Sequence, residues 1–215
     1  MRPPQSARVS NSSGKQKFVI LMMIIVIMGL TAAVSAGILN SDDIKSSGAG
    51  PSSVHINVEN FGKVTDFYYR GAQPGEADYE QLSALGIKTV IDLRDDPRAY
   101  ARPSALKSGM KYISLPMSDK DYPQHDVATK FLSIVNNKEN WPVFVHCAGG
   151  RHRTGAMTAV YRMTIEGWDF DRAYAEMKNY DFYTRWGHKA IKQFVIDYYK
   201  ELNTVHKDRK ISADK

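Results

Sequence analysis

The residues best suited to chemistry lie in one short stretch, His146–Gly155, which reads His-Cys-Ala-Gly-Gly-Arg-His-Arg-Thr-Gly. Cys147 is the only cysteine in the chain of 215 residues, and Arg153 follows it after five intervening positions. A cysteine near a helix N-terminus is stabilised as the reactive thiolate, and an arginine offers a planar pair of donors to two phosphate oxygens. The stretch therefore predicts nucleophilic attack on a phosphate ester.

Two elements are expected to position these residues. The apolar run 142–145 is typical of a buried strand, and the run 156–161 is typical of a helix. Backbone amides at a helix N-terminus can bind phosphate oxygens, and glycines allow the loop between strand and helix to turn tightly. We therefore expect Cys147 as nucleophile and Arg153 as the group that binds the transferred phosphate.

The other loop positions also have predicted roles. Thr154 is expected to hydrogen-bond the Cys147 sulfur and to stabilise it as nucleophile and as leaving group. The positions expected to bind the substrate phosphate are Ala148, Gly149, Gly150, Arg151 and His152. The alternative, a buried cysteine that acts only as a small apolar side chain, fits poorly with the basic and polar neighbours of Cys147.

The loop resembles the signature His-Cys-x5-Arg-Ser/Thr of the cysteine-dependent protein tyrosine and dual-specificity phosphatases. Two further segments, Tyr69–Pro74 and Leu85–Arg94, are similar to elements of compact bacterial and atypical dual-specificity members, so the resemblance covers most of residues 60–165. It implies a tyrosine phosphatase-like fold. It also implies a two-step reaction without metal or cofactor, in which Cys147 is phosphorylated and water then releases the phosphate.

The resemblance also implies a general acid, an aspartate upstream of the cysteine that protonates the leaving group. Asp119 lies 28 residues before Cys147, in a Pro-x-x-Asp context after an expected strand, and is the predicted acid. Asp121 is its close rival. Asp126 is a third candidate, but it is expected to start a helix.

The substrate class is open at this stage. Phosphotyrosine or another phosphomonoester, on a protein or a small molecule, is the first expectation. The segment Gly150–Gly155 resembles the Gly-Lys-His-Arg-Thr-Gly of plant and fungal atypical members that act on inositol pyrophosphates, and charge at Arg151 and His152 would suit such a polyanion. Alternatives of other classes are a non-catalytic phosphate-binding module and a sulfur-transfer domain.

Strand and helix patterns alternate along the chain. Strand patterns cover 88–93, 110–115 and 142–145, and helix patterns cover 76–85, 127–135, 155–165, 169–179 and 188–202. This alternation predicts an α/β fold with a central, mostly parallel sheet flanked by helices. Ligands of such sheets bind beyond the carboxyl ends of the strands, where Cys147 falls.

Several other side chains could serve either the site or the core. Asp95 and Asp96 are interpreted as turn or helix-cap residues. Arg70 is expected either to pair with an acidic residue in the core or to approach the phosphate loop, and the structural role is favoured. Three aromatic residues near the C-terminus are interpreted as packing residues, with the pocket mouth as the alternative: Tyr180, Tyr183 and Trp186.

The N-terminal 36 residues predict targeting. Basic residues precede the apolar run 18–30, and Val-Ser-Ala precedes Gly37, as in a secretory signal peptide. Counted to Leu39, the segment is also long enough for an uncleaved membrane anchor. Both readings place the rest of the chain across a membrane, in a bacterial periplasm or cell envelope, either anchored or secreted.

Composition divides the chain into four predicted parts: a signal peptide or anchor (1–36), a flexible linker (37–53), a phosphatase domain (54–205) and a polar tail (206–215). The net charge is +6, but the first 36 residues hold four basic and no acidic residues, which leaves 25 basic and 23 acidic residues in the rest. We therefore expect no nucleic-acid partner. The six histidines lack metal-ligand spacing, so no metal site is predicted.

Overall fold

The computed structural model describes residues 56–213, which lie within a compact unit that runs from Gly50 to Lys215. The predicted signal peptide or anchor and the predicted linker lie outside the described residues. Within residues 56–213, no helix is both long enough and apolar enough to cross a membrane.

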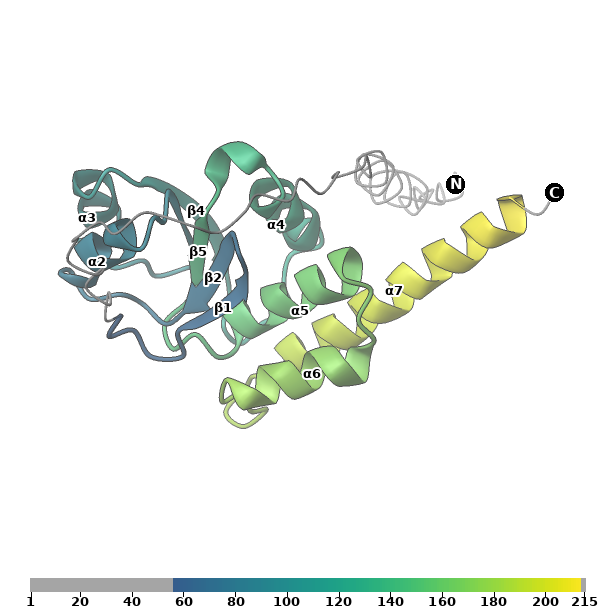
Figure 1. Ribbon diagram of the computed structural model, residues 1–215. Helices are drawn as coiled ribbons and strands as arrows, with labels where there is room; N and C mark the ends of the chain where they lie inside the picture. Colours follow the sequence, from purple (N-terminus) through teal and green to yellow (C-terminus); the bar gives the residue numbers. More distant parts are fainter. Residues whose placement is uncertain (1–55, 214–215) are drawn as a thin grey trace, which may run out of the picture. The chain divides into compact units, whose positions relative to one another are not determined.

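Five strands form one sheet in the order β1-β2-β5-β3-β4 (Figure 1). The strands are β1 (Gly62–Thr65), β2 (Tyr68–Gly71), β3 (Thr89–Arg94), β4 (Lys111–Met117) and β5 (Val143–His146). Only β1 and β2 pair antiparallel, and every other neighbouring pair is parallel. The predicted α/β fold with a mostly parallel sheet is confirmed, and the strand that leads into Cys147 is the central one.

Helices cover both faces of the sheet (Figure 1). On one face lie α2 (Asp78–Ala84) and α3 (Ala101–Lys107), and on the other lie α4 (Val127–Val135) and α5 (Arg153–Ile165). The helices α6 (Phe170–Asn179) and α7 (Lys189–Ala213) pack against α5 and against each other. A short 3-10 helix, η1 (Lys138–Asn140), precedes β5.

The central strand is held by apolar packing on both faces. All four residues of β5 are buried, as are all six of β3, which agrees with the apolar runs Val143–Val145 and Val90–Ile91 in the sequence. Phe144 of β5 packs in a cluster with Val90 of β3 and with side chains of α2 and α3. This packing holds the end of β5 in place, and the chain leaves the sheet at Cys147.

Helix α7 is longer than expected. The predicted helix ends at Leu202 and is followed by a polar tail, whereas the observed helix continues to Ala213. The residues from 206 to 213 include no glycine and no proline, and most have moderate to good helix propensity, so no local signal ends the helix.

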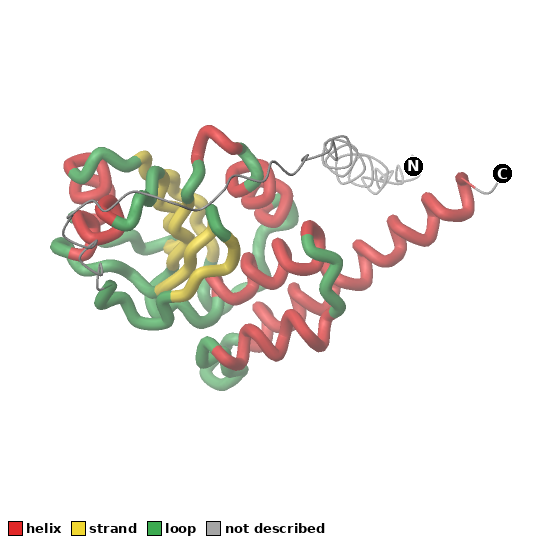
Figure 2. Tube along the Cα trace, in the orientation of Figure 1, coloured by secondary structure: helices red, strands yellow, loops and turns green. Residues whose placement is uncertain are grey.

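The loops that follow β2, β3, β4 and β5 meet at one edge of the sheet (Figure 2). Parallel strands place their carboxyl ends together, which brings distant parts of the chain to one place. These four loops carry Gln73, Asp95, Asp119 and Cys147 in that order.

Candidate active site

The phosphate loop, residues 147–153, turns its carbonyl groups toward the rest of the protein. Three successive carbonyls each accept a hydrogen bond: Ala148 from the backbone amide of Gln73 at 3.1 Å, Gly149 from Nδ2 of Asn60 at 2.8 Å, and Gly150 from Nη2 of Arg70 at 2.6 Å. The N–H and C=O groups of a trans peptide point in opposite directions. The amides that follow these carbonyls therefore face the inside of the loop, where they can bind phosphate oxygens.

Cys147 lies at the start of this loop, directly after β5. Its side chain is free of any disulfide and only 3% exposed. Helix α5 begins at Arg153, so the free amides of its first turn and its dipole lie on the side of the loop and favour an anion there. The predicted nucleophile is thus placed where both a thiolate and a phosphate are stabilised.

Arg153 is oriented by two contacts through one nitrogen. Its Nη1 donates to the Asp95 carboxylate at 2.7 Å and to the carbonyl of Met117 at 3.0 Å. Within residues 56–213, neither Nε nor Nη2 of Arg153 has a hydrogen-bond partner. These two donors form the edge of the guanidinium that matches two phosphate oxygens, so the geometry suits a bidentate contact with a substrate.

Asp95 is the residue of this site that sequence reasoning missed. Asp95 and Asp96 lie in the turn after β3, as the turn interpretation predicts, but Asp95 also pairs with Arg153 and Asp96 with Arg94, both at 2.7 Å. The position of Asp95 in the sequence could have indicated this contact, because Asp95 directly follows β3 and β3 lies beside β5 in the sheet.

Thr154 is fully buried in the first turn of α5. Its Oγ1 has no hydrogen-bond partner among the described residues, so the predicted bond to the Cys147 sulfur is not formed in this structure. The role of Thr154 toward the sulfur stays a prediction.

Arg151 is neutralised by acidic neighbours. Its Nη2 lies 2.7 Å from the Glu59 carboxylate, and its Nε lies 3.7 Å from the Asp181 carboxylate. A guanidinium with two carboxylates beside it adds little net positive charge to the loop. The side chain predicted to attract a polyanion is thus already paired within the protein.

The side chain of His152 packs against residues outside the phosphate loop. Its Nε2 lies 3.1 Å from the carbonyl of Tyr183, and its ring stacks on the ring of His188 with centroids 3.6 Å apart. Burial, together with the nearby His188, lowers the pKa of His152 to about 4. The ring is therefore neutral near pH 7, so His152 contributes its backbone, not a charge, to the loop.

The two candidate acids have different surroundings. The backbone carbonyl of Asp119 accepts a hydrogen bond from Nδ1 of His188 at 2.7 Å, and its half-buried carboxylate acts electrostatically on His152 of the phosphate loop. Asp121 is exposed and accepts a hydrogen bond from the Ser118 hydroxyl at 2.9 Å. The geometry favours Asp119.

Asp126 is placed as expected. It directly precedes helix α4 and forms an ion pair with Lys130 at 2.7 Å. Both side chains are more than half exposed, and the pair joins neighbouring turns of one helix. This contact accounts for Asp126 without a role in the site.

Comparison with known proteins identifies the family. The model of the family PTP-NADK, described as "DSP-PTPase phosphatase fused to NAD+ Kinase", matches residues 53–193. This chain belongs to the DSP-PTPase phosphatase family. The predicted resemblance is thereby confirmed, and the matched range contains every predicted site residue of this phosphatase.

Three relatives show the range of the family. The phosphatase is 30% identical over 131 residues to the probable tyrosine-protein phosphatase DG1060 of Dictyostelium discoideum, covering 59% of this chain and 78% of that protein. It is 29% identical over 124 residues to the dual specificity protein phosphatase TpbA of Pseudomonas aeruginosa, covering 57% of this chain and 55% of TpbA. It is 28% identical over 153 residues to the inositol diphosphatase SIW14 of Saccharomyces cerevisiae, covering 68% of this chain and 53% of SIW14.

Solved structures of two of these relatives share the fold. The catalytic domain of SIW14 aligns with a TM-score of 0.59 at 25% identity, over 71% of this chain and 94% of that domain. The structure of TpbA aligns with a TM-score of 0.56 at 25% identity, over 65% of this chain and 84% of the solved TpbA chain. The phosphatase thus spans nearly the whole solved SIW14 domain but about half of the full-length TpbA and SIW14 proteins.

Arg70 supports the phosphate loop through its hydrogen bond to the Gly150 carbonyl. It is fully buried, its guanidinium lies 3.8 Å from the ring centroid of Tyr180, and its Nε and Nη1 have no hydrogen-bond partner among the described residues. Of the two expected placements, the structure shows the approach to the loop through the Gly150 carbonyl, and no ion pair within residues 56–213. A buried cation without a carboxylate beside it favours anions at the loop.

His146 is also placed to orient the loop. It is fully buried, and its Nδ1 lies 3.4 Å from the Cys147 carbonyl and 3.9 Å from the Asp92 carboxylate. Burial lowers the pKa of His146, which favours its neutral form.

In the described part of the chain, no three His, Cys, Asp or Glu side chains are arranged to hold a metal ion.

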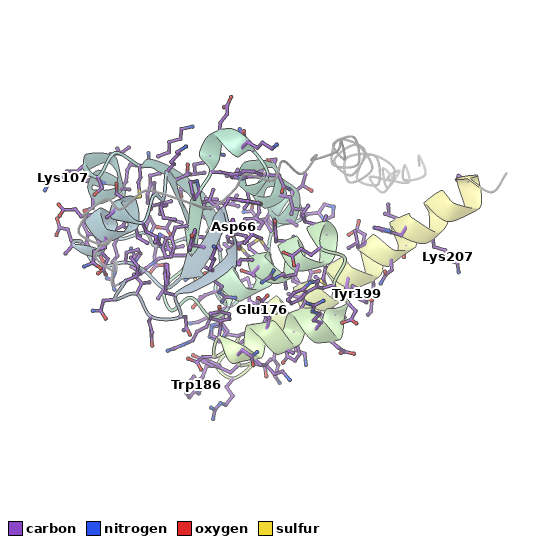
Figure 3. The ribbon with its side chains drawn as sticks, viewed as in Figure 1. Asp66, Lys107, Glu176, Trp186, Tyr199 and Lys207 are labelled. Atoms are coloured by element: carbon purple, nitrogen blue, oxygen red, sulfur yellow. The ribbon has the colours of Figure 1, made fainter. Side chains whose placement is uncertain are left out.

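The three C-terminal aromatic residues divide between packing and exposure. Tyr180 packs on Arg70 and Tyr183 packs on the His152 ring, as the packing interpretation predicts. Trp186 contradicts that interpretation, since it is 76% exposed on the loop before α7 (Figure 3). Its ring contacts Tyr183 edge-on at 5.8 Å, which is its link to the residues around the site.

We expect Gly150→Ala to destabilise the phosphatase by about 2–4 kcal/mol. Gly150 has φ +67°, and an added Cβ would lie 2.6 Å from the backbone carbon of Gly71 and 2.7 Å from the amide nitrogen of Ala72. Urea unfolding measures the loss. The matched control is Gly149→Ala, whose Cβ would meet only Arg151 side-chain atoms, at 3.7 Å or more. Equal unfolding free energies for the two variants would contradict this account.

Proposed function

We propose that this phosphatase hydrolyses phosphomonoesters, with phosphotyrosine as the first substrate class, through a phosphocysteine intermediate. The observation that carries the proposal is the phosphate loop itself. Its inward-facing amides and the open edge of Arg153 surround the position next to the Cys147 sulfur where a phosphate would bind. Such preorganised donors stabilise the charge that develops on the transferred phosphoryl group.

In the first step, the Cys147 thiolate attacks phosphorus and the bond from phosphorus to the leaving oxygen breaks. Asp119, in its protonated form, gives its proton to that oxygen, so an alcohol or phenol departs. In the second step, a water attacks the phosphocysteine, Asp119 accepts a proton from the water, and the phosphorus–sulfur bond breaks. The products are inorganic phosphate, the free thiolate and the protonated acid, which can begin another cycle.

The charges around the loop support phosphotyrosine over a polyanion. Arg151 is paired with Glu59 and Asp181, and His152 is neutral near pH 7, so neither side chain supplies the extra positive charge that a polyphosphate requires. A substrate with one phosphate needs only the loop amides and Arg153. TpbA, a relative at 29% identity, is named as a dual specificity protein phosphatase, which agrees with this choice.

Inositol pyrophosphate hydrolysis is the second candidate. The match to the inositol diphosphatase SIW14 and the structural likeness to its catalytic domain support it. Two further relatives, DSP5 and DSP4 of Arabidopsis thaliana, carry the name inositol diphosphatase at 28% and 27% identity. Each of these relatives is matched over only part of its length, so the substrate is decided by experiment.

The test is a substrate panel with phosphotyrosyl peptides and inositol pyrophosphates, read as phosphate release. We expect the wild-type protein to prefer the phosphotyrosyl peptides. We expect Glu59→Gln, which removes one carboxylate from Arg151, to raise the relative activity on inositol pyrophosphates by roughly threefold, about the effect of one exposed ion pair. Strong release from inositol pyrophosphates by the wild-type protein, with none from phosphotyrosyl peptides, would reverse the order of the two candidates.

The matched control for Glu59→Gln is Glu80→Gln. Glu80 is an exposed residue in the first turn of α2, so this variant removes the same charge away from the phosphate loop. We expect its substrate preference to equal that of the wild-type protein. An equal shift in both variants would mean that net charge, and not the pairing of Arg151, sets the preference.

A further inference from the structure

Two stacked histidines join the phosphate loop to the Asp119 loop, which comprises residues 118–126. His152 belongs to the phosphate loop, and His188 directly precedes α7. Their rings lie 3.6 Å apart with 13° between the planes, and both side chains are at least nine-tenths buried. From this stack, Nδ1 of His188 reaches the Asp119 carbonyl at 2.7 Å.

The hydrogen bonds of the stack define which nitrogen carries the proton on each ring. A carbonyl oxygen can only accept, so Nδ1 of His188 must be the donor to Asp119. In the same way, Nε2 of His152 must donate to the carbonyl of Tyr183, 3.1 Å away. Each ring is therefore oriented by a backbone acceptor and by the other ring.

Residues 183–188, the segment that runs from Tyr183 to His188, also contact the Asp119 loop directly. Gly187 has φ +100°, and a Cβ added there would lie 3.3 Å from Cγ of Lys120. The backbone at this point therefore lies against the side chain that follows Asp119. The segment contacts both loops, because Tyr183 binds His152 and His188 binds Asp119.

The three residues that follow Asp119 are more exposed than Asp119 itself. Lys120, Asp121 and Tyr122 are exposed. Asp121 accepts a hydrogen bond from the Ser118 hydroxyl at 2.9 Å, and Tyr122 makes a long hydrogen bond of 3.4 Å to Asp197 and packs edge-on against Phe194. A general acid acts only when its carboxyl group lies within hydrogen-bond reach of the leaving oxygen, and small displacements cost much of the rate. The hydrogen bond from the buried His188 is made to Asp119 itself, the residue whose carboxyl group must be placed most accurately.

We propose that His188 is a positioning residue that holds Asp119 over the phosphate loop for protonation of the leaving group. This inference rests on the proposed function, because it assigns His188 to the general-acid step of that reaction. His188 acts through Asp119 and does not itself contact the reacting atoms.

The test compares His188→Phe with His188→Asn. Phenylalanine keeps an aromatic ring against His152 but loses the donor to Asp119, whereas asparagine loses the ring but keeps an N–H donor near the position of Nδ1. Phenyl phosphate has a poor leaving group, phenoxide, which needs a proton to depart. On this substrate we expect kcat/KM to fall about tenfold in His188→Phe and to recover at least in part in His188→Asn. The dinitrophenolate of dinitrophenyl phosphate departs without a proton. On this substrate we expect kcat/KM to change by less than about twofold in His188→Phe.

A double-mutant cycle with Asp119→Asn separates positioning from general damage. Once the acid is removed, His188→Phe should cause no further loss on phenyl phosphate, because its effect runs through Asp119. The rate of Cys147 alkylation by iodoacetamide should be the same in wild type and His188→Phe, which shows an intact phosphate loop.

Three results would overturn the inference: equal losses of His188→Phe on both substrates, no loss on either, or an undiminished loss in the Asp119→Asn background. The proposed function fails in a different way. A wild-type protein that hydrolyses none of the phosphoesters would refute the reaction itself, and the comparison of His188 variants would not be needed to show it.

Discussion

Cys147→Ser is expected to reduce the hydrolysis of an aryl phosphate by at least about 10⁴-fold, because a serine hydroxyl stays protonated near pH 7 and is a much weaker nucleophile than a thiolate. In the proposed reaction, the thiolate is both the nucleophile of the first step and the leaving group of the second. The substitution changes one atom of a side chain that is 3% exposed, so the loop and its amides should keep their arrangement. Phosphate release from phenyl phosphate measures the loss.

Binding provides the control for this variant. The loop carbonyls held by Gln73, Asn60 and Arg70 do not involve the sulfur, so Cys147→Ser should still be stabilised against thermal unfolding by tungstate, an inorganic phosphate analogue. A Cys147→Ser protein with wild-type turnover would refute the phosphocysteine mechanism. A variant that is folded but has lost tungstate binding would show that the sulfur is needed to shape the loop.

Asp119→Asn is expected to give the second largest effect, a loss of about 10²–10⁴-fold in kcat/KM on phenyl phosphate. Asparagine keeps the size and the backbone hydrogen bond from His188 but has no acidic proton to donate. The loss should be much smaller on dinitrophenyl phosphate, because its leaving group departs as a stable anion. Steady-state kinetics on the two substrates measures both effects.

Asp121→Asn is the matched control. It makes the same chemical change two residues away, at an exposed side chain that accepts a hydrogen bond from the Ser118 hydroxyl, a bond that the asparagine oxygen can also accept. We expect its kcat/KM to stay within about twofold of wild type on both substrates. If Asp121→Asn instead showed the leaving-group dependence and Asp119→Asn did not, Asp121 would be the acid.

Much of this site could be predicted because it is contiguous in the sequence. The strand, the loop and the helix that hold Cys147 and Arg153 follow one another within residues 142–165, and each has a clear local pattern. The alternation of strands and helices also predicts the parallel sheet, and a parallel sheet places Cys147 at its ligand-binding edge. Local propensity and hydrophobic periodicity suffice for features of this kind.

The partners of the loop side chains were beyond the sequence. Arg153 is held by Asp95, 58 residues away, and Arg151 by Glu59, 92 residues away. The predicted charge of Arg151 and His152 is therefore present in the sequence but is cancelled by pairing or by burial in the fold. Which groups meet at such distances depends on strand order and on the packing of loops, and no local pattern encodes either.

The sequence alone thus determined the family resemblance and the class of fold, and it predicted the nucleophile and the phosphate-binding arginine. The tertiary structure decided which acidic residues pair with Arg151 and Arg153, and that His188 contacts the Asp119 carbonyl. The division has one physical cause. Helices, strands and tight loops depend on neighbours along the chain, whereas charge, burial and hydrogen bonding at a site depend on neighbours in space.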